Sequence, residues 1–544
     1  MRLSNESVKD KILWEKADIS LPKFDRDAMI EATGKAPKWI HFGAGNIFRS
    51  FPAALAQILL EQGHETTGIV VTEGYDGEII DKCYTPFDNL CILVTLKSDG
   101  TTDKKVIASV ASSFRMDRSF AELKKIFVKS SLQMASFTIT EKGYNLTNRD
   151  GSLLSDIAGD IRLGPEEPKS YLGHIAALCH ERYVNGAYPL ALVSMDNCSH
   201  NGDRLSAAME TFAKGWVSKN MVDAGFLNYI RNPQKISFPW TMIDKITPRP
   251  DESVRNLLTA GGIEDMQDIV TEKKTYIAPF VNAEETQYLV IEDAFPNGRP
   301  ALEKTGALFT NRETVDKVEK MKVGTCLNPL HTALAIFGCL LGYKRISDEM
   351  KDTDLVKLVE GIGYREGLPV AVDPGIIKPK EFMDQVIKTR LVNPFMPDTP
   401  QRIAADTSQK ICVRFGGTLK AYRDSGNDML ELRLIPLVFA GWLRYLLGVD
   451  DVGNPFEVSP DPLYESLKES LGGIFLGQLN IEKKFIHSKL KPIISNPSLF
   501  GLDLYEAGLA NRVEKYFRKM ISGTGEVRRL LSKIIVKQES VPSL

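Results

Sequence analysis

The chain has 544 residues, too many for a single hydrophobic core, so two or more domains are expected. Hydrophobic residues make up 43% and charged residues 25% of the chain, a composition typical of soluble globular proteins rather than disordered or membrane proteins. The net charge is -2, from 68 basic and 70 acidic residues, so electrostatics gives no reason to expect nucleic acid or an anionic membrane as a partner.

Neither a targeting segment nor a disulfide framework is indicated. The first residues, MRLSNESVKDKILWEK, contain no apolar run typical of a signal peptide. The apolar stretches 332–343 and 434–449 are predicted to be buried helices, because the first is too short for a bilayer and Arg444 interrupts the second. The seven cysteines form no CxxC pair. We therefore expect a cytoplasmic protein with reduced thiols and no bound metal.

The first 300 residues alternate β-rich runs with stretches of helical periodicity. The predicted strands lie in WIHFGAG, TTGIVVTEG, CILVTLKSDG, MASFTITEKGY and YPLALVSMDNCSHNG, and most of them run into a polar, glycine-bearing loop. Strands that alternate with helices favour a mostly parallel sheet with both faces covered. The sequence predicts an α/β domain over residues 1–300.

After residue 300 helical patterns dominate. The segments NPLHTALAIFGCLLGY, DLVKLVEGIGYREGL, LRLIPLVFAGWLRYLLG and AGLANRVEKYFRKMISG are predicted to be helices. The Pro- and Gly-rich segment 295–306 separates the two patterns. A mainly α-helical second domain is therefore expected over residues 301–544.

The segment PKWIHFGAGNIFRSF raises the possibility of a dinucleotide-binding turn. A strand delivers Gly43 and Gly45 to the start of a helix whose first turn contains Asn46 and Ile47. Glycines let a pyrophosphate approach the backbone, and a helix N-terminus offers free N–H groups. The usual third glycine is missing, and Arg49 could donate a charge-assisted bond to phosphate instead. A purely structural turn is the alternative.

Glu73 ends the next predicted strand, where a carboxylate commonly holds the adenosine ribose. Such a carboxylate favours NAD over NADP, because it repels a 2′-phosphate. The alternative is a solvent-exposed glutamate with no ligand.

A second candidate site lies in KMKVGTCLNPLHTALAIFG. Asn328 followed by Pro329 is typical of an N-cap and first helical position, and His331 lies three residues after Asn328. Lys322 precedes them. A lysine can act as a general base when its pKa is lowered, and asparagine and histidine can polarise a carbonyl oxygen. A helix cap, one buried histidine and a surface lysine are the alternative.

These motifs together resemble one family. HFGAGNIFR, FTITEKGY, SMDNCSHNG, FPWTMIDKITP, VIEDAFPNGRP and GWLRYLLGVDDVGNP are similar, in family order, to segments of the polyol-specific long-chain dehydrogenases/reductases. The resemblance runs from about residue 37 to about residue 455. It implies an N-terminal Rossmann-type domain that binds NAD, a mainly helical C-terminal domain, a metal-free site between them, and hydride transfer between nicotinamide and a sugar carbon.

The resemblance also implies roles for individual residues. Lys322 corresponds to the family's general base, and Asn328 and His331 to the residues that hold the reacting oxygen. Asn197, in the DN…HNG loop, is expected near that oxygen or the nicotinamide.

Four further positions correspond to substrate-binding parts of the family. Asp244 lies in the DKITP segment, and Glu292 in VIED matches a glutamate near the proton path. Arg390 and Lys410 fall in a region that lines the sugar pocket. Either cation could bind a substrate carboxylate.

The spacing of the lysine motif departs from the family. Five residues separate Lys322 from Asn328, whereas the family usually has four, and Val323 stands at the usual lysine position. A continuous α-helix would turn Lys322 away by about 100°. A turn around Gly324 would absorb the additional residue, and we favour that interpretation.

The expected activity is NAD-dependent interconversion of D-fructuronate and D-mannonate. Oxidation of D-mannitol to D-fructose and reduction of tagaturonate are alternatives within the family. In a different class, the chain would be an inactive sensor that binds NAD or a sugar. The expected partner is a small sugar or sugar acid, and the sequence does not indicate an oligomeric state.

Overall fold

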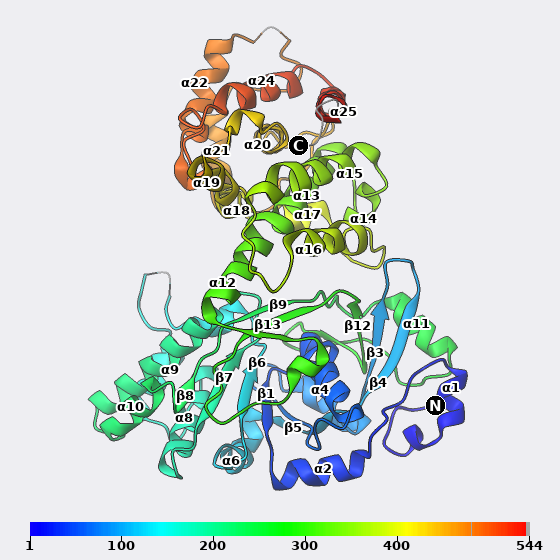
Figure 1. Ribbon diagram of the computed structural model, residues 1–544, viewed down its shortest axis with the longest axis vertical. Coiled ribbons are helices and arrows are strands. Elements are labelled where there is room, and N and C mark those ends of the chain that lie inside the picture. Colours follow the sequence, from blue (N-terminus) through cyan, green and yellow to red (C-terminus); the bar gives the residue numbers. More distant parts are fainter. Residues whose placement is uncertain (149, 480, 540–544) are drawn as a thin grey trace. The chain divides into compact units, whose positions relative to one another are not determined.

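The computed structural model describes residues 1–148, 150–479 and 481–539 (Figure 1). These residues form two compact units. Unit 1 consists of Met1–Lys97 and Thr101–Asp316, and unit 2 of Ser98–Gly100 and the chain from Lys317 onward. The division falls within helix α12 (Arg312–Met321), downstream of the boundary predicted after residue 300.

Unit 1 contains the strands and a set of covering helices. The strands are β1 (Trp39–Phe42), β2 (Ile69–Glu73), β3 (Cys91–Leu96), β4 (Thr102–Ile107), β5 (Val110–Arg115), β6 (Met134–Phe137), β7 (Leu190–Ser194), β8 (Ile236–Ser237), β9 (Thr241–Asp244), β10 (Ile269–Val270), β11 (Tyr276–Ile277), β12 (Phe280–Glu284), β13 (Tyr288–Glu292) and β14 (Leu308–Thr310). The helices are α1 (Lys11–Lys16), α2 (Arg26–Lys35), α3 (Asn46–Ser50), α4 (Pro52–Glu61), α5 (Glu78–Cys83), α6 (Met116–Phe127), α7 (Ser155–Leu163), α8 (Tyr171–Val184), α9 (Asn201–Ser218), α10 (Ala224–Arg231) and α11 (Glu252–Ala260).

The largest sheet among the described residues has six strands in the order β5-β2-β1-β6-β7-β8, and all neighbouring pairs are parallel. The strand order runs outward from β1 through β2 and β5 on one side, and from β6 through β7 and β8 on the other. The order therefore reverses between β1 and β6, as in a Rossmann-type sheet. The prediction of a mostly parallel α/β domain is confirmed. The strand predicted in CILVTLKSDG forms as β3, but it lies in a separate sheet of order β12-β3-β4. A third sheet has the order β14-β13-β9.

Both faces of the parallel sheet are buried, because side chains alternate between two cores. Trp39 packs with residues of α3, α4 and α5, whereas Ile40 and Phe42 pack with residues of α6, α8 and α9. The helices on each face are visible in Figure 1. Burial on both sides explains why the strand reads as a continuous apolar run rather than as alternating polar and apolar residues.

Unit 2 is built from helices. They are α13 (Asn328–Leu341), α14 (Ile346–Glu349), α15 (Thr353–Glu360), α16 (Pro379–Gln385), α17 (Pro400–Ile403), α18 (Thr407–Arg414), α19 (Gly416–Ser425), α20 (Leu434–Tyr445), α21 (Tyr464–Ser470), α22 (Lys483–Ile494), α23 (Pro497–Phe500), α24 (Ala510–Met520) and α25 (Glu526–Glu539), with π-helices at Lys322–Cys326, Gly361–Gly367 and Val386–Arg390. The mainly helical second domain is thus confirmed.

The two most apolar helices, α13 and α20, pack against each other in the core of unit 2. Residues 312–341 are long and apolar enough to cross a membrane by composition alone, but 78% of the most apolar window is buried inside the protein. Arg444 of α20 is also buried, and its guanidinium donates to the carbonyls of Val449 (2.5 Å) and Asp450 (2.9 Å). These helices are therefore core helices, as predicted.

A buried polar chain joins β1 to β6. His41 Nδ1 lies 2.6 Å from Ser136 Oγ, and His41 Nε2 lies 2.9 Å from Thr138 Oγ1. Trp39 Nε1 also donates to Ser136 Oγ. Burial lowers the pKa of His41 to about 3, so the ring is neutral in the folded protein at physiological pH.

His41→Gln should weaken the pH dependence of the stability of unit 1. The unfolded chain binds a proton at this position below about pH 6.5, whereas the folded chain does not until the pH approaches about 3. The free energy of unfolding therefore falls by about 2 kcal/mol between pH 6.5 and pH 5 in the wild type. Urea unfolding at several pH values, followed by tryptophan fluorescence, measures this loss. An unchanged pH dependence in the variant would contradict a neutral, buried His41.

Candidate functional site

Gly43 lies where the chain leaves β1 at the reversal point of the sheet. Its φ is 109°, a left-handed conformation that favours glycine. A Cβ at this position would lie 2.3 Å from the carbonyl oxygen of Thr138, which follows β6. The Gly43 N–H donates to the Thr72 carbonyl at 2.8 Å. Gly43 is thus required for the close approach of three strand ends.

Gly45 has a different role, because its backbone is ordinary and the space beside it is open. It is the N-cap of α3, with φ -73°, and an added Cβ would meet no atom within 4 Å. Asn46 and Ile47 form the first turn of α3. The N–H groups at the start of α3 and the open space beside Gly45 are the features that could hold the pyrophosphate of a dinucleotide.

Arg49 supports this turn from within the protein. Its side chain is buried, and it donates to the carbonyl of Ala278 (2.5 Å) and to Asn46 Oδ1 (2.6 Å). Asn46 Nδ2 in turn donates to the Tyr276 carbonyl. Two of the guanidinium nitrogens thus bind protein acceptors, and Arg49 positions the side chain of Asn46. A direct bond from Arg49 to a phosphate stays a prediction.

Glu73 also holds the turn rather than facing outward. Its carboxylate accepts N–H bonds from Ala44 (2.8 Å), Tyr75 (2.8 Å) and Asp76 (3.1 Å). Burial raises the pKa of Glu73, although these three bonds oppose the shift. Oε2 binds the loop after β1 and Oε1 binds the loop after β2, so the carboxylate ties the two loops together. Its contact with ribose stays a prediction.

The loop after β7 contains Asn197 in an exposed bend. Its neighbour Asp196 is buried and accepts bonds from the N–H groups of Ile139 and Thr140, both at 2.9 Å. Asn201 is fully buried, donates to the Asp196 carbonyl (3.0 Å) and exchanges bonds with Thr241. Neither of these two positioning residues was predicted from the sequence, although both belong to the motif MDNCSHNG.

Asp244 and Glu292 lie on the paired strands β9 and β13. Asp244 ends β9 and is buried, opposite Tyr288. Glu292 Oε2 accepts bonds from the Trp240 N–H (3.0 Å) and from Arg312 Nε (2.9 Å). Arg312 was not predicted, because nothing in the local sequence connects it with a carboxylate twenty residues earlier.

Lys322 begins a π-helix that continues directly from α12. The Leu327 N–H donates to the Lys322 carbonyl at 3.0 Å, a bond across five residues. This corrects the expectation of a turn around Gly324. Because a π-helix accommodates one more residue per hydrogen-bonded ring than an α-helix, it absorbs the additional residue before Asn328 without breaking the helix. The side chain of Lys322 is buried.

Asn328 is the first residue of α13, and Leu327 stands at the N-cap with no side-chain cap bond. The predicted N-cap role of Asn328 is therefore wrong. Only Leu327 separates the π-helix from α13, so Asn328 already lies within the helix and cannot be its N-cap.

His331 lies in the first turn of α13, with its side chain 14% exposed and its Nε2 atom buried. Its Nε2 has no hydrogen-bond partner within the described ranges, and the nearest carboxylate oxygen, Asp398 Oδ2, is 3.9 Å away. Burial lowers the pKa of His331 to about 4; Asp398 opposes the shift, and neighbouring arginines add to it. The neutral ring thus carries an unsatisfied nitrogen that is suited to a ligand oxygen.

Arginines lie near this histidine, opposed by Asp398. Arg390 ends the π-helix Val386–Arg390 and is buried, and it acts on His331 together with Arg414. Arg414 donates to Thr332 Oγ1 at 2.6 Å, and burial lowers its pKa to about 10. Lys410 donates to the Ala405 carbonyl at 2.7 Å. Arg414 was not predicted, because the sequence of α18 contains no recognisable motif.

Gly43→Ala should reduce stability, whereas Gly45→Ala should reduce NAD affinity. The first substitution forces a Cβ against the Thr138 carbonyl at positive φ, so it should reduce the free energy of unfolding by about 2 kcal/mol or more. The second should leave stability within about 0.5 kcal/mol but weaken NAD binding about tenfold. Urea unfolding and cofactor titration measure the pair. Unchanged NAD affinity in Gly45→Ala would contradict the pyrophosphate site.

Comparison with known proteins agrees with this architecture. Residues 37–304 match the model of the mannitol dehydrogenase Rossmann domain, and residues 314–521 match the mannitol dehydrogenase C-terminal domain. The chain is 50% identical to a D-mannonate oxidoreductase of Thermotoga maritima, over 99% of this chain and 100% of that protein.

Two solved structures share the fold. A D-sorbitol dehydrogenase in substrate-free form superposes with a TM-score of 0.77 at 23% identity, over 96% of this chain and 98% of that one. The mannitol 2-dehydrogenase of Pseudomonas fluorescens, in a ternary complex with NAD and D-mannitol, gives 0.68 at 24% identity over the whole of both chains. The resemblance inferred from the motifs is confirmed, and the chain belongs to the mannitol dehydrogenase family of oxidoreductases.

Proposed function

We propose that this protein interconverts D-mannonate and D-fructuronate with NAD as its cofactor, in the cytoplasm. The observation that carries the proposal is the 50% identity, over both complete domains, with the D-mannonate oxidoreductase of Thermotoga maritima. Relatives that are named for mannitol are far less similar, at 26–28% identity.

Unit 1 supplies the cofactor site of this proposal. The N–H groups at the start of α3, behind the open face of Gly45, would bind the pyrophosphate. Asn46, held by Arg49, and Ile47 would border it. Glu73 would act by fixing the turn through Ala44. When bound, NAD supplies the acceptor for the hydride that leaves the sugar carbon.

Unit 2 supplies the proton chemistry. We assign Lys322 as the group that takes the proton of the substrate hydroxyl during oxidation and returns it during reduction. Asn328 and the neutral ring of His331 would hold the reacting oxygen, because the unsatisfied Nε2 can donate to it in the Nε2–H tautomer. Asn197 of unit 1 is assigned to the same oxygen or to the nicotinamide.

The charge around His331 favours a sugar acid over a neutral polyol. Arg390 and Arg414 lie near the ring within a mostly buried environment. A carboxylate would offset the cost of burying these guanidinium groups, whereas a hexitol offers only neutral hydroxyls. Lys410, Asp244 and Glu292 are proposed as further substrate contacts or as supports of them. Mannitol oxidation remains the second candidate.

A substrate panel tests the proposed activity. Oxidation of NADH, followed at 340 nm, should proceed with D-fructuronate and be at least about a hundredfold slower with D-fructose, because the fructose lacks the carboxylate. Comparable rates with D-fructose would favour the mannitol reaction, and faster turnover of D-tagaturonate would identify the other uronate. NADH binding without turnover of any of these sugars would indicate a sensor.

Lys322→Ala should lower kcat by about 10²–10⁴-fold, because the general acid and base is lost. NADH affinity should stay unchanged, since that site is assigned to unit 1. Lys320→Ala, which removes an exposed lysine two residues earlier, serves as the matched control and should keep full activity. Full activity of Lys322→Ala would show that another group moves the proton.

A further inference from the structure

A basic groove lies within unit 2, lined by α24, α25, Ser522 between them, Arg433 and residues 478, 479 and 481. Its volume is about 990 Å³. Of the sixteen residues that line the basic groove, four are lysines, four are arginines and one, Glu526, is acidic. The whole chain has a net charge of only -2, so the groove is a local concentration of positive charge and does not reflect a basic protein.

The cations are arranged on two helix faces. Along α24, Arg512, Lys515 and Arg518 follow one another at intervals of three, and along α25, Arg529 and Lys533 are separated by four. Residues three or four apart share one face of a helix. Since α24 and α25 pack against each other, both basic faces line the same groove. Like charges at this spacing repel one another, so the arrangement is unfavourable without an anion.

The protein itself neutralises only part of this charge. Glu526 pairs with Lys519 at 2.6 Å and with Arg529. Arg512 donates to the carbonyls of Leu430 and Leu432.

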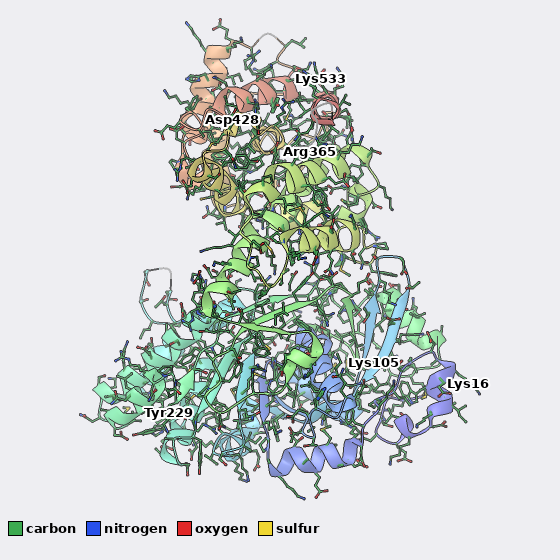
Figure 2. All side chains as sticks on the ribbon, in the orientation of Figure 1. Lys16, Lys105, Tyr229, Arg365, Asp428 and Lys533 are labelled. Carbon is green, nitrogen blue, oxygen red and sulfur yellow. The ribbon has the colours of Figure 1, made fainter. Side chains whose placement is uncertain are left out.

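Three other cations of the groove, Lys515, Arg518 and Lys533, pair with no carboxylate in the part of the chain that the structure describes. Lys515 and Lys533 are exposed, and Arg518 is half-buried. Lys533 is labelled on α25 in Figure 2.

We propose that the basic groove is a binding site for a small polyphosphate anion, either inorganic or the triphosphate of a nucleotide. Phosphate oxygens accept bonds from both lysine and arginine, and arginine binds them in a bidentate manner. The volume lies within the range of small-ligand sites. A bounded groove of this size suits a compact anion better than a nucleic acid, which needs an extended basic track. None of the assigned catalytic residues lines the groove, so its ligand would be an effector and not the substrate.

Calorimetric titration with inorganic tripolyphosphate tests this site. The complete protein is saturated with NAD beforehand, in buffer without divalent cations, so that the cofactor site is closed to the probe. Binding should weaken steeply with added salt, because it releases counterions and is screened. The triple variant Lys515→Ala, Arg518→Ala, Lys533→Ala should bind about tenfold more weakly or worse. ATP in place of tripolyphosphate shows whether a nucleoside adds affinity.

A matched control separates the groove from total charge. The variant Lys351→Ala, Lys378→Ala, Lys468→Ala removes three exposed lysines from other parts of unit 2 and should bind like the wild type. Circular dichroism and unfolding establish that both variants are folded. Absence of binding to the wild type, equal weakening in the two variants, or tighter binding of a single-stranded oligonucleotide than of tripolyphosphate would each overturn the proposal.

Discussion

The contact between Gly43 and Thr138 is the constraint on which the cofactor half of the protein depends. Here β1 and β6 are parallel neighbours, but the chain leaves them toward opposite sides of the sheet. The two strand ends approach so closely that a Cβ would lie 2.3 Å from the Thr138 carbonyl. Only glycine permits this approach, and the loops that diverge from it leave open space beside Gly45.

Buried polar groups hold this arrangement in place. The His41 ring forms hydrogen bonds with the hydroxyls of Ser136 and Thr138. The Glu73 carboxylate accepts a bond from the Ala44 N–H and so links the loops after β1 and β2. Each of these groups is satisfied by hydrogen bonds, which is the condition for burying it. His331 in unit 2 breaks the rule, because its buried Nε2 has no partner among the described residues. Because this atom lies in the motif that resembles the family's catalytic segment, we assign it to a ligand oxygen.

The regular parts of the fold were predictable from the sequence, because they follow from local periodicity. Four of the six strands of the parallel sheet, β1, β2, β6 and β7, were identified in this way, as were the glycine turn and the apolar helices α13 and α20, whereas β5 and β8 were not predicted. The catalytic set itself rested on resemblance, and its assignments remain proposals. The family and the Rossmann-type architecture that the motifs implied are confirmed.

What the sequence did not reveal depends on partners far along the chain. Arg49 donates to the Ala278 carbonyl, more than two hundred residues later in the chain. Arg312 donates to Glu292, which also accepts a bond from the Trp240 N–H. The π-helix at Lys322 was missed because Gly324 was expected to end the helix in a turn, whereas the hydrogen bond from the Leu327 N–H to the Lys322 carbonyl shows that the helix continues. The sequence motifs therefore identified candidate residues, and the structure shows which groups these residues contact.

Isotope transfer tests the central claim most directly, that this chain catalyses hydride transfer between NAD and a sugar acid. D-Fructuronate is reduced with NADH that carries deuterium at the reactive C4 position, and the D-mannonate formed is analysed by mass spectrometry. The account predicts a product that contains one deuterium on the carbon that bore the carbonyl. The experiment is run twice, with deuterium on one face of C4 and then on the other. Product without deuterium in both runs, or no product at all, would contradict the proposed hydride transfer.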